Sequence, residues 1–232
     1  MSEIIGFLGS YPSDICMYAA YALQNAGKSV CVVDNSQDGI LFRCVPTPDE
    51  RLAAVTFRQV DFLRREPPVQ WHELDYEFVL VQMGSRPQEL CLALCSMRIL
   101  VVDCECSNLD FYRRYMQESS LSMTVLLRGF LPDRILLERI KQRLEMGQGF
   151  IERWLLLPFD EADEAYRIEM QYGRIHQFPY ISAGMERMLT QLLRMLGVHD
   201  KLRVMRAVRD AKQGKTAENV CNKRKRLVMM EG

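Results

Sequence analysis

The first 34 residues constrain the fold most, because they contain two short apolar strands joined by a tight turn and a helix. Residues 4–8 are almost continuously apolar and run into Gly9-Ser10. Residues 13–26 have helical character, and the apolar run 30–33 then ends at Asp34. Strand, turn, helix, strand and terminal carboxylate are typical of the opening unit of a nucleotide-binding α/β domain.

The rest of the chain continues this alternation of strands and helices. A continuously apolar run indicates a parallel strand that is covered on both faces. We therefore predict an α/β fold, with a doubly wound, mostly parallel sheet and helices on both faces. The further strands are expected at 78–81, 99–102, 124–127 and 154–157, with an edge strand at 54–60 and a short strand or turn at 40–45. The further helices are expected at 87–96, 109–117, 132–145 and 182–196.

The charge distribution suggests a body and a tail. The 232 residues carry no net charge, yet residues 201–232 hold ten Lys/Arg against three Asp/Glu, so the rest of the chain is acidic. A chain of this length suits one domain with an appendage. We predict a nucleotide-binding-like domain over 1–198 and a basic, partly helical or disordered tail over 199–232, with a possible helix at 200–211.

The turn after the first strand lacks the chemistry of a phosphate-binding loop. Such a loop needs several glycines and a lysine, so that backbone N–H groups and an ammonium surround the phosphates. Here the sequence is Gly9-Ser10-Tyr11-Pro12-Ser13-Asp14. It contains no lysine, Pro12 removes a backbone donor, and Asp14 places a negative charge where a phosphate would lie.

The order of elements resembles the deviant P-loop family of MinD, ParA and the pilus-associated TadZ/CpaE proteins, over about residues 3–197. The segment 27–34 is similar to that family's second strand, which ends in a carboxylate near magnesium. Residues 76–82 (YEFVLVQ) resemble its "YDFVIID" strand, residues 156–161 its "IPYD" segment, and residues 173–179 its "GxP" connection.

The resemblance also implies where a nucleotide site has degenerated. Asp34 survives from the second motif, but Ser36 takes the place of its other carboxylate. Gln82 replaces an aspartate that orients the water shell of magnesium, and Arg128 follows Leu127 where the family has an adenine-contacting asparagine. The nine positions of this degenerate site are Gly9, Ser10, Pro12, Ser13, Asp14, Asp34, Ser36, Gln82 and Arg128.

Several of these residues have a structural alternative. Asp34 is a functional acid, a cap or a solvated loop residue, and Arg128 either holds an anion or is an ordinary surface arginine. The three histidines are scattered and support no catalytic triad, and the eight cysteines lack the spacing of a zinc site, so we predict free thiols and no metal. No cofactor is expected; ATP with Mg is the alternative.

The tail leaves three interpretations open. Lys223, Arg224, Lys225 and Arg226 form a basic cluster beside an apolar end. This cluster could contact an acidic membrane surface, contact nucleic acid without reading its sequence, or remain solvated. The sequence has neither a signal peptide nor a transmembrane run, which predicts a cytoplasmic protein, with peripheral contact at the inner face of the membrane as an alternative.

The resemblance implies a non-catalytic pseudo-ATPase that works as a scaffold or positioning protein through protein partners, with a homodimer as one option. Placement of a pilus or secretion apparatus, as in the TadZ/CpaE branch, is the first specific hypothesis. The alternatives are a weakly active ATPase with a rearranged phosphate loop and a DNA-associated partition factor.

Overall fold

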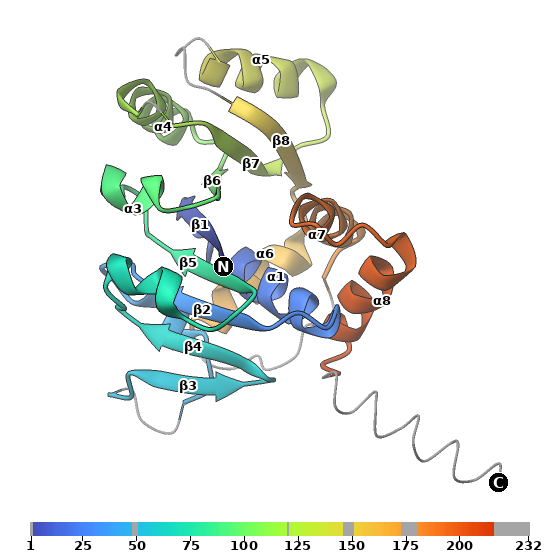
Figure 1. The fold of residues 1–232 in the computed structure, drawn as a ribbon. Helices are drawn as coiled ribbons and strands as arrows, with labels where there is room; N and C mark the ends of the chain where they lie inside the picture. The colour runs from blue at the N-terminus through green and yellow to red at the C-terminus, as the bar shows by residue number, and fades with distance from the viewer. Residues whose placement is uncertain (1, 48–50, 120, 146–150, 173–180, 216–232) are drawn as a thin grey trace, which may run out of the picture.

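A computed structural model describes residues 2–47, 51–119, 121–145, 151–172 and 181–215. These residues form an eight-stranded sheet in the order β3-β4-β2-β5-β1-β6-β7-β8 (Figure 1). Neighbouring strands are parallel except for β3 and β4, which form an antiparallel hairpin at one edge. The strands are β1 (Glu3–Gly9), β2 (Val30–Asp34), β3 (Ala54–Phe57), β4 (Val60–Arg64), β5 (Phe78–Gln82), β6 (Met97–Val102), β7 (Met123–Phe130) and β8 (Ile151–Pro158).

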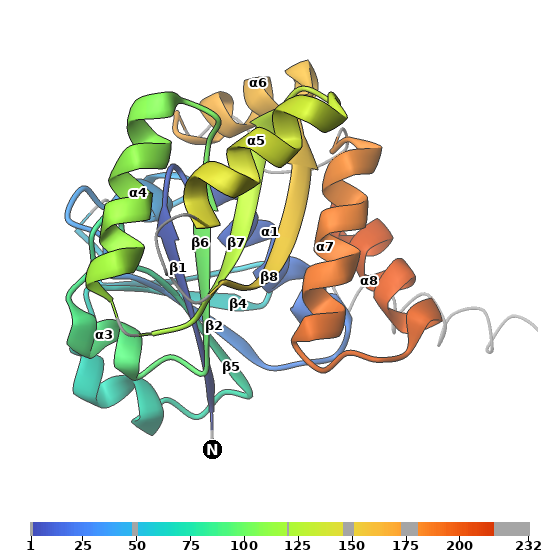
Figure 2. The ribbon, with the colours of Figure 1, turned by 90° about the horizontal axis from the view of Figure 1, so that it is seen from above.

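Helices cover both faces of the sheet, so the predicted doubly wound α/β fold class is confirmed (Figure 2). One hydrophobic cluster joins the sheet to α1, α7 and α8, and the other joins it to α3, α4 and α5. The helices are α1 (Ser13–Asn25), α2 (Ile40–Arg43), η1 (Pro68–Glu73), α3 (Glu89–Ala93), α4 (Cys106–Glu118), α5 (Arg134–Glu145), α6 (Glu161–Met170), α7 (Ala183–Met195) and α8 (Lys201–Lys212).

Helix α1 is the central helix of its layer. It is buried from Ser13 to Leu23, because the sheet covers one side and α7 and α8 cover another. Small residues such as Ala19 and Ala20 allow this close approach. A helix that is apolar nearly all round is the type that a protein encloses in its core.

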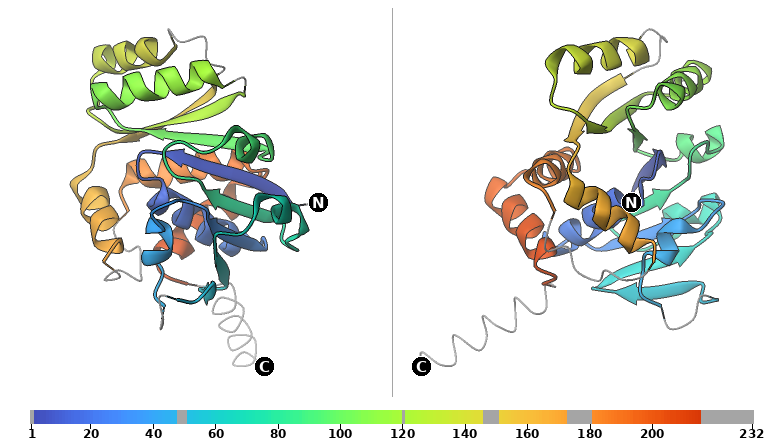
Figure 3. Two further views of the ribbon diagram at one scale, coloured as in Figure 1. Left: turned by 90° about the vertical axis from the view of Figure 1, so that its left-hand side faces the viewer. Right: turned by 180° about the vertical axis from the view of Figure 1, so that it is seen from behind.

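Helix α8 lies within the segment predicted as a tail. Asp200 caps it by accepting hydrogen bonds from the backbone N–H groups of Leu202 and Arg203. Its inner face, which includes Val204 and Val208, is buried against α1 and α7. The right-hand view of Figure 3 shows α7 and α8, in orange to red, side by side on one face of the molecule. The basic cluster 223–226 lies outside the described residues.

One local prediction was wrong and another was correct only in part. The segment 40–45 forms the short helix α2 rather than a strand or turn, because Gly39, with φ of 63°, turns the chain before it. The edge strand predicted over 54–60 is present as β3, but it ends at Phe57, where Arg58 and Gln59 adopt positive φ angles and reverse the chain into β4. Tight hairpins need this backbone twist, which glycine or asparagine usually supplies, so no residue here signals a turn.

Candidate functional site

The residues predicted from the degenerate motif gather at the carboxyl ends of β1, β2, β5 and β7, beside the start of α1. From β1 the chain passes through α1 to β2 on one side, whereas β6, β7 and β8 extend the sheet on the other side. The strand order therefore reverses at β1. Open parallel sheets bind ligands outside the carboxyl ends of their strands at such a reversal.

Strand alternation explains why three of these side chains face α1. Asp34, Gln82 and Arg128 each follow, by two positions, a residue that packs in the α1 layer of the core. Residues two apart on a strand point to the same face. Register also places Asp34 opposite Gln82 on adjacent strands.

The backbone N–H groups of the turn after β1 donate to carbonyl groups of neighbouring segments. The Gly9 N–H donates to the Gly84 carbonyl over 2.9 Å, and the Ser10 N–H donates to the Val101 carbonyl over 2.8 Å. Gly9 has φ of 106°, and a Cβ there would lie 2.0 Å from the Val101 oxygen, so only glycine fits. Two backbone donors that could hold a phosphate are thus already satisfied.

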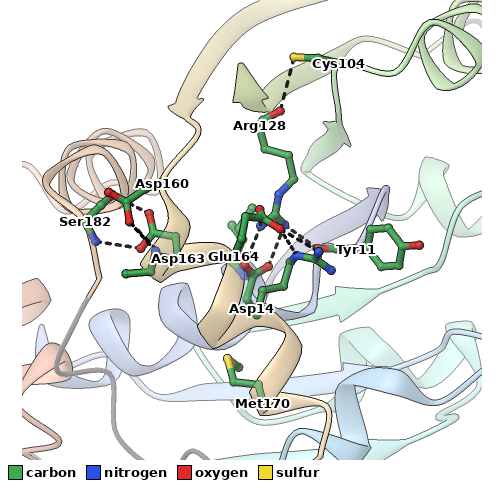
Figure 4. Close-up of polar contacts among 12 residues, drawn as sticks. Tyr11, Asp14, Cys104, Arg128, Asp160, Asp163, Glu164, Met170 and Ser182 are labelled. Carbon is green, nitrogen blue, oxygen red and sulfur yellow. Dashed lines mark hydrogen bonds and ion pairs between the residues drawn. The ribbon is translucent and has the colours of Figure 1, made fainter. Parts of the chain in front are cut away.

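A buried ion pair fills the space at the start of α1 (Figure 4). The Arg128 guanidinium binds the Asp14 carboxylate with both ends, over 3.1 Å and 3.0 Å. It also donates to the Tyr11 carbonyl over 2.9 Å and to Glu164 Oε1, from α6, over 3.2 Å. Arg128 is 4% exposed and Asp14 2% exposed, so this is a deeply buried pair.

The charges of this cluster are balanced, because Arg128 pairs with Asp14 while Arg167 of α6 pairs with Glu164 over 2.8 Å. Burial acts to lower the pKa of Arg128, but its attraction to Asp14 and Glu164 outweighs burial and raises that pKa, so the side chain is charged. The Asp14 carboxylate also accepts the Ile15 N–H over 2.9 Å, in the first turn of α1. A carboxylate there compensates the positive end of the helix dipole. Of the two predictions for Arg128, a surface position is therefore excluded.

Asp34 is buried at the end of β2 and accepts hydrogen bonds from the segment that follows it. Its carboxylate accepts hydrogen bonds from the Ser36 hydroxyl over 2.5 Å, from the Ser36 N–H over 3.2 Å and from the Phe42 N–H over 2.9 Å. These bonds hold the loop after β2 against α2. The neighbouring Gln82 is buried, and its Oε1 has no hydrogen-bond partner among the described residues.

Helix α6, which was not predicted, supplies the rest of the cluster. Asp160 caps it by accepting the N–H groups of Ala162 and Asp163, which places Glu164 in the first turn facing Arg128. Aspartate followed by acidic residues after a strand and a proline is an N-terminal helix signal, and it could have located α6 from the sequence. Nothing in the sequence identifies the Tyr11 carbonyl as a partner of Arg128.

Asp163 ties α6 to α7. Its carboxylate accepts the Ser182 N–H over 2.8 Å and the Ser182 hydroxyl over 2.5 Å, at the start of α7. Burial raises the pKa of Asp163 above its usual value of 3.8, although the two bonds from Ser182 act to lower it. Glu164 and Asp163 therefore connect the ion pair to the α7 and α8 layer.

The structure brings the nine predicted positions to the carboxyl ends of the strands, but only some of their side chains contact one another. Asp14 pairs with Arg128, and Ser36 bonds to Asp34. In the described part of the chain, no group of three or more His, Cys, Asp or Glu residues could hold a metal ion. Nor is any helix in that part both long and apolar enough to cross a membrane.

No protein-family model matches the chain, and no curated protein matches it either. Solved structures do. A ParA-family ATPase from Chlorobium tepidum has a TM-score of 0.61 at 14% identity, covering 84% of this chain and 98% of that chain. MinD in the MinC:MinD cell division complex of Aquifex aeolicus has a TM-score of 0.59 at 13% identity, covering 84% and 96%.

A putative plasmid partition protein from Borrelia burgdorferi, bound to AMPPNP, has a TM-score of 0.58 at 10% identity, covering 85% of this chain and 99% of that chain. These identities establish the fold alone, and the coverage shows that nearly the whole length of each neighbour is represented. The chain has the fold of the MinD and ParA P-loop ATPases.

Proposed function

We propose that this protein is a non-catalytic scaffold or positioning protein in which an internal ion pair has replaced the bound nucleotide. One observation carries the proposal: the Arg128 guanidinium and the Asp14 carboxylate pair at the start of α1, buried and bonded at both ends. In P-loop proteins, the N-terminus of the helix after the loop is where phosphates bind.

The charges argue against a polyphosphate at this position. Asp14 would face the incoming phosphates, and two like charges about 4 Å apart repel by about 4 kcal/mol at the effective dielectric constant of a partly buried site. Rotating Arg128 toward a phosphate would leave Asp14 buried and unpaired, which costs several kcal/mol more. The Gly9 and Ser10 N–H groups, already bonded to backbone carbonyls, offer no compensation.

A scaffold role agrees with what the fold does elsewhere. MinD forms a complex with MinC, and the Borrelia burgdorferi neighbour is a putative plasmid partition protein, so the fold supports recruitment and positioning. The resemblance of the sequence to the TadZ/CpaE branch favours placement of a pilus or secretion apparatus among these roles. This finer role rests on the sequence motifs alone.

Calorimetric titration of the protein with ATP and ADP, with and without Mg²⁺, tests the proposal. We expect no heat of binding at millimolar nucleotide. An active ATPase with this fold, titrated in the same buffer, is the positive control. Micromolar, magnesium-dependent binding would overturn the proposal.

A second candidate, a weak nucleotide hydrolase with a rearranged loop, is favoured by one observation. The buried Oε1 of Gln82 at the end of β5 has no partner among the described residues, so this edge could accept a donor from a water or a ligand. Release of inorganic phosphate from ATP, measured for the wild type and for Gln82→Leu, distinguishes the two. Phosphate release that Gln82→Leu abolishes would favour the hydrolase, whereas no release supports the scaffold.

A further inference from the structure

A groove lies between α7 and α8, the two helices that cover α1 on one face of the molecule. Its volume is about 1220 Å³. This is larger than most small-molecule sites, which hold roughly 300–1,000 Å³. We call it the α7–α8 groove; it is lined by Arg187 and Arg194 from α7 and by Leu202, Met205, Arg206 and Arg209 from α8, among others.

The groove is strongly basic. Arg153 of β8, Arg187, Arg194, Lys201 and Arg206 all line it and are exposed, and none of them forms an ion pair with a described residue. The acid in the lining, Glu186, is already neutralised by Lys212 over 2.5 Å. The groove therefore presents an excess of positive charge in a concave surface, which focuses the field on an acidic partner.

Apolar side chains lie between these cations. Leu202 is 67% exposed and Met205 53% exposed, and both line the groove. They stand three residues apart on α8 and thus share one side of that helix. The core-facing side of α8 consists of other residues, including Val204 and Val208, so Leu202 and Met205 contribute little to the fold.

We propose that the α7–α8 groove docks an acidic amphipathic helix of a partner protein. Two ridges of helix with a trough between them match the helix-in-groove mode of peptide recognition, in which apolar anchors enter the trough. Arg187 and Arg194 are seven residues apart, about 10 Å along α7, which corresponds to two turns of a bound helix. Leu202 and Met205 would contact its apolar residues, and the arginines its carboxylates.

Shape and composition decide against the other acidic partners. A flat bilayer would touch only the rims of a trough and would leave its floor uncovered. Nucleic acid gains little from Leu202 and Met205, and the described residues of the lining include no Phe, Tyr or Trp on which a base could stack. The groove includes neither Arg128 nor Asp14, so this proposal stands independently of the nucleotide question.

Fluorescence anisotropy with defined probes tests the proposal on the full-length protein. The first probe is a labelled helical peptide of about 18 residues, with leucines at i, i+3, i+4 and i+7 and glutamates flanking them. A scrambled peptide of the same composition is its control. Parallel titrations use vesicles of phosphatidylcholine with phosphatidylglycerol and a short DNA duplex.

The decisive variant is Arg194→Glu/Arg206→Glu, which reverses one charge on each ridge. The matched control is Arg134→Glu/Arg139→Glu on α5, because these two arginines are also exposed and helical and the net charge changes equally. We expect the groove variant to weaken the acidic peptide at least about tenfold, since charge pairs across an interface are often worth this much. The α5 variant should weaken it less than about twofold, and the groove variant should gain affinity for a lysine-substituted peptide.

Three results would overturn the proposal. The scrambled peptide could bind as tightly as the patterned one, which would leave only nonspecific charge attraction. The groove and α5 variants could lose affinity equally. Vesicles or DNA could bind more tightly than the peptide, with a loss confined to the groove variant, and the partner would then be a membrane or a nucleic acid.

Discussion

The start of α1 and the α7–α8 groove both contain arginines, but these differ in burial and in their ion-pair partners. At the start of α1 one arginine, Arg128, is buried and satisfied by Asp14, Glu164 and a backbone carbonyl. In the groove, arginines such as Arg194 and Arg206 are exposed and have no ion-pair partner among the described residues. Water compensates an exposed cation at little cost, whereas a buried one must have partners.

The two regions therefore differ in their capacity to bind a charged partner. At the carboxyl ends of the strands, where this fold binds nucleotide, the buried charged side chains already pair with one another. The groove has cationic side chains without an ion-pair partner among the described residues, exposed apolar side chains and a concave shape.

The largest effect should follow removal of the buried cation. Arg128→Met leaves the Asp14 carboxylate buried without its ion partner, and breaking a buried pair in this way typically costs about 3–5 kcal/mol. We expect the free energy of unfolding, measured by urea titration, to fall by that amount. A loss below about 1 kcal/mol would mean that water reaches Asp14 and that the site is open.

The double variant Asp14→Leu/Arg128→Met sharpens this result. Replacing both partners by apolar residues removes the unpaired charge, and such replacements are often close to neutral. We therefore expect the double variant to be more stable than Arg128→Met alone. Additive losses would show that the two side chains do not act as a pair.

A smaller effect is expected at Asp34. Asp34→Ala removes the acceptor of three hydrogen bonds that hold the loop after β2, and bonds to a charged group contribute about 1.5–3 kcal/mol. The unfolding free energy should fall by at least the contribution of one such bond, and Asp34→Asn, which keeps one acceptor oxygen, should lose less. If the protein is a scaffold, partner binding should survive both substitutions; its loss in a folded Asp34→Ala protein would revive Asp34 as a functional acid.

The sequence predicted the arrangement of the sheet well, because parallel strands buried on both faces are continuously apolar and stand out. It failed where a local conformation lacks its usual residues, as in the β3–β4 turn formed by Arg58 and Gln59. At the candidate site, it identified Asp14 and Arg128 separately as departures from a motif. It could not show that they pair, because residues 114 positions apart meet only through the fold.

The next effect depends on pH and concerns Asp163. This residue joins α6, which contacts Arg128 at the start of α1, to α7, which lines the α7–α8 groove. Its pKa is raised in the folded protein, so the stability it contributes is complete below the unfolded pKa and is lost as pH rises through the folded pKa. The stability of the wild type relative to Asp163→Asn should therefore fall as pH rises above about 4.

Thermal unfolding of both proteins across pH 3 to 8 (about the full range of a carboxyl titration) measures this difference. Ser182→Ala supplies the control. It removes the hydroxyl bond that opposes burial, so the pKa of Asp163 should rise further and the loss of stability should move to higher pH. A stability difference that does not vary with pH would show that water reaches the Asp163 carboxyl group and leaves its pKa close to the ordinary value.

The smallest effect on stability is expected in the groove, and its smallness is informative. Arg194→Gln and Arg206→Gln change exposed side chains that form no ion pair among the described residues, and such substitutions usually shift the unfolding free energy by less than about 0.5 kcal/mol. Relief of repulsion between neighbouring cations could even stabilise the fold slightly. A loss of more than about 1 kcal/mol would show that these arginines are structural, as Arg128 is. Their exposure would then say nothing about a partner, and the contrast between the two regions would disappear.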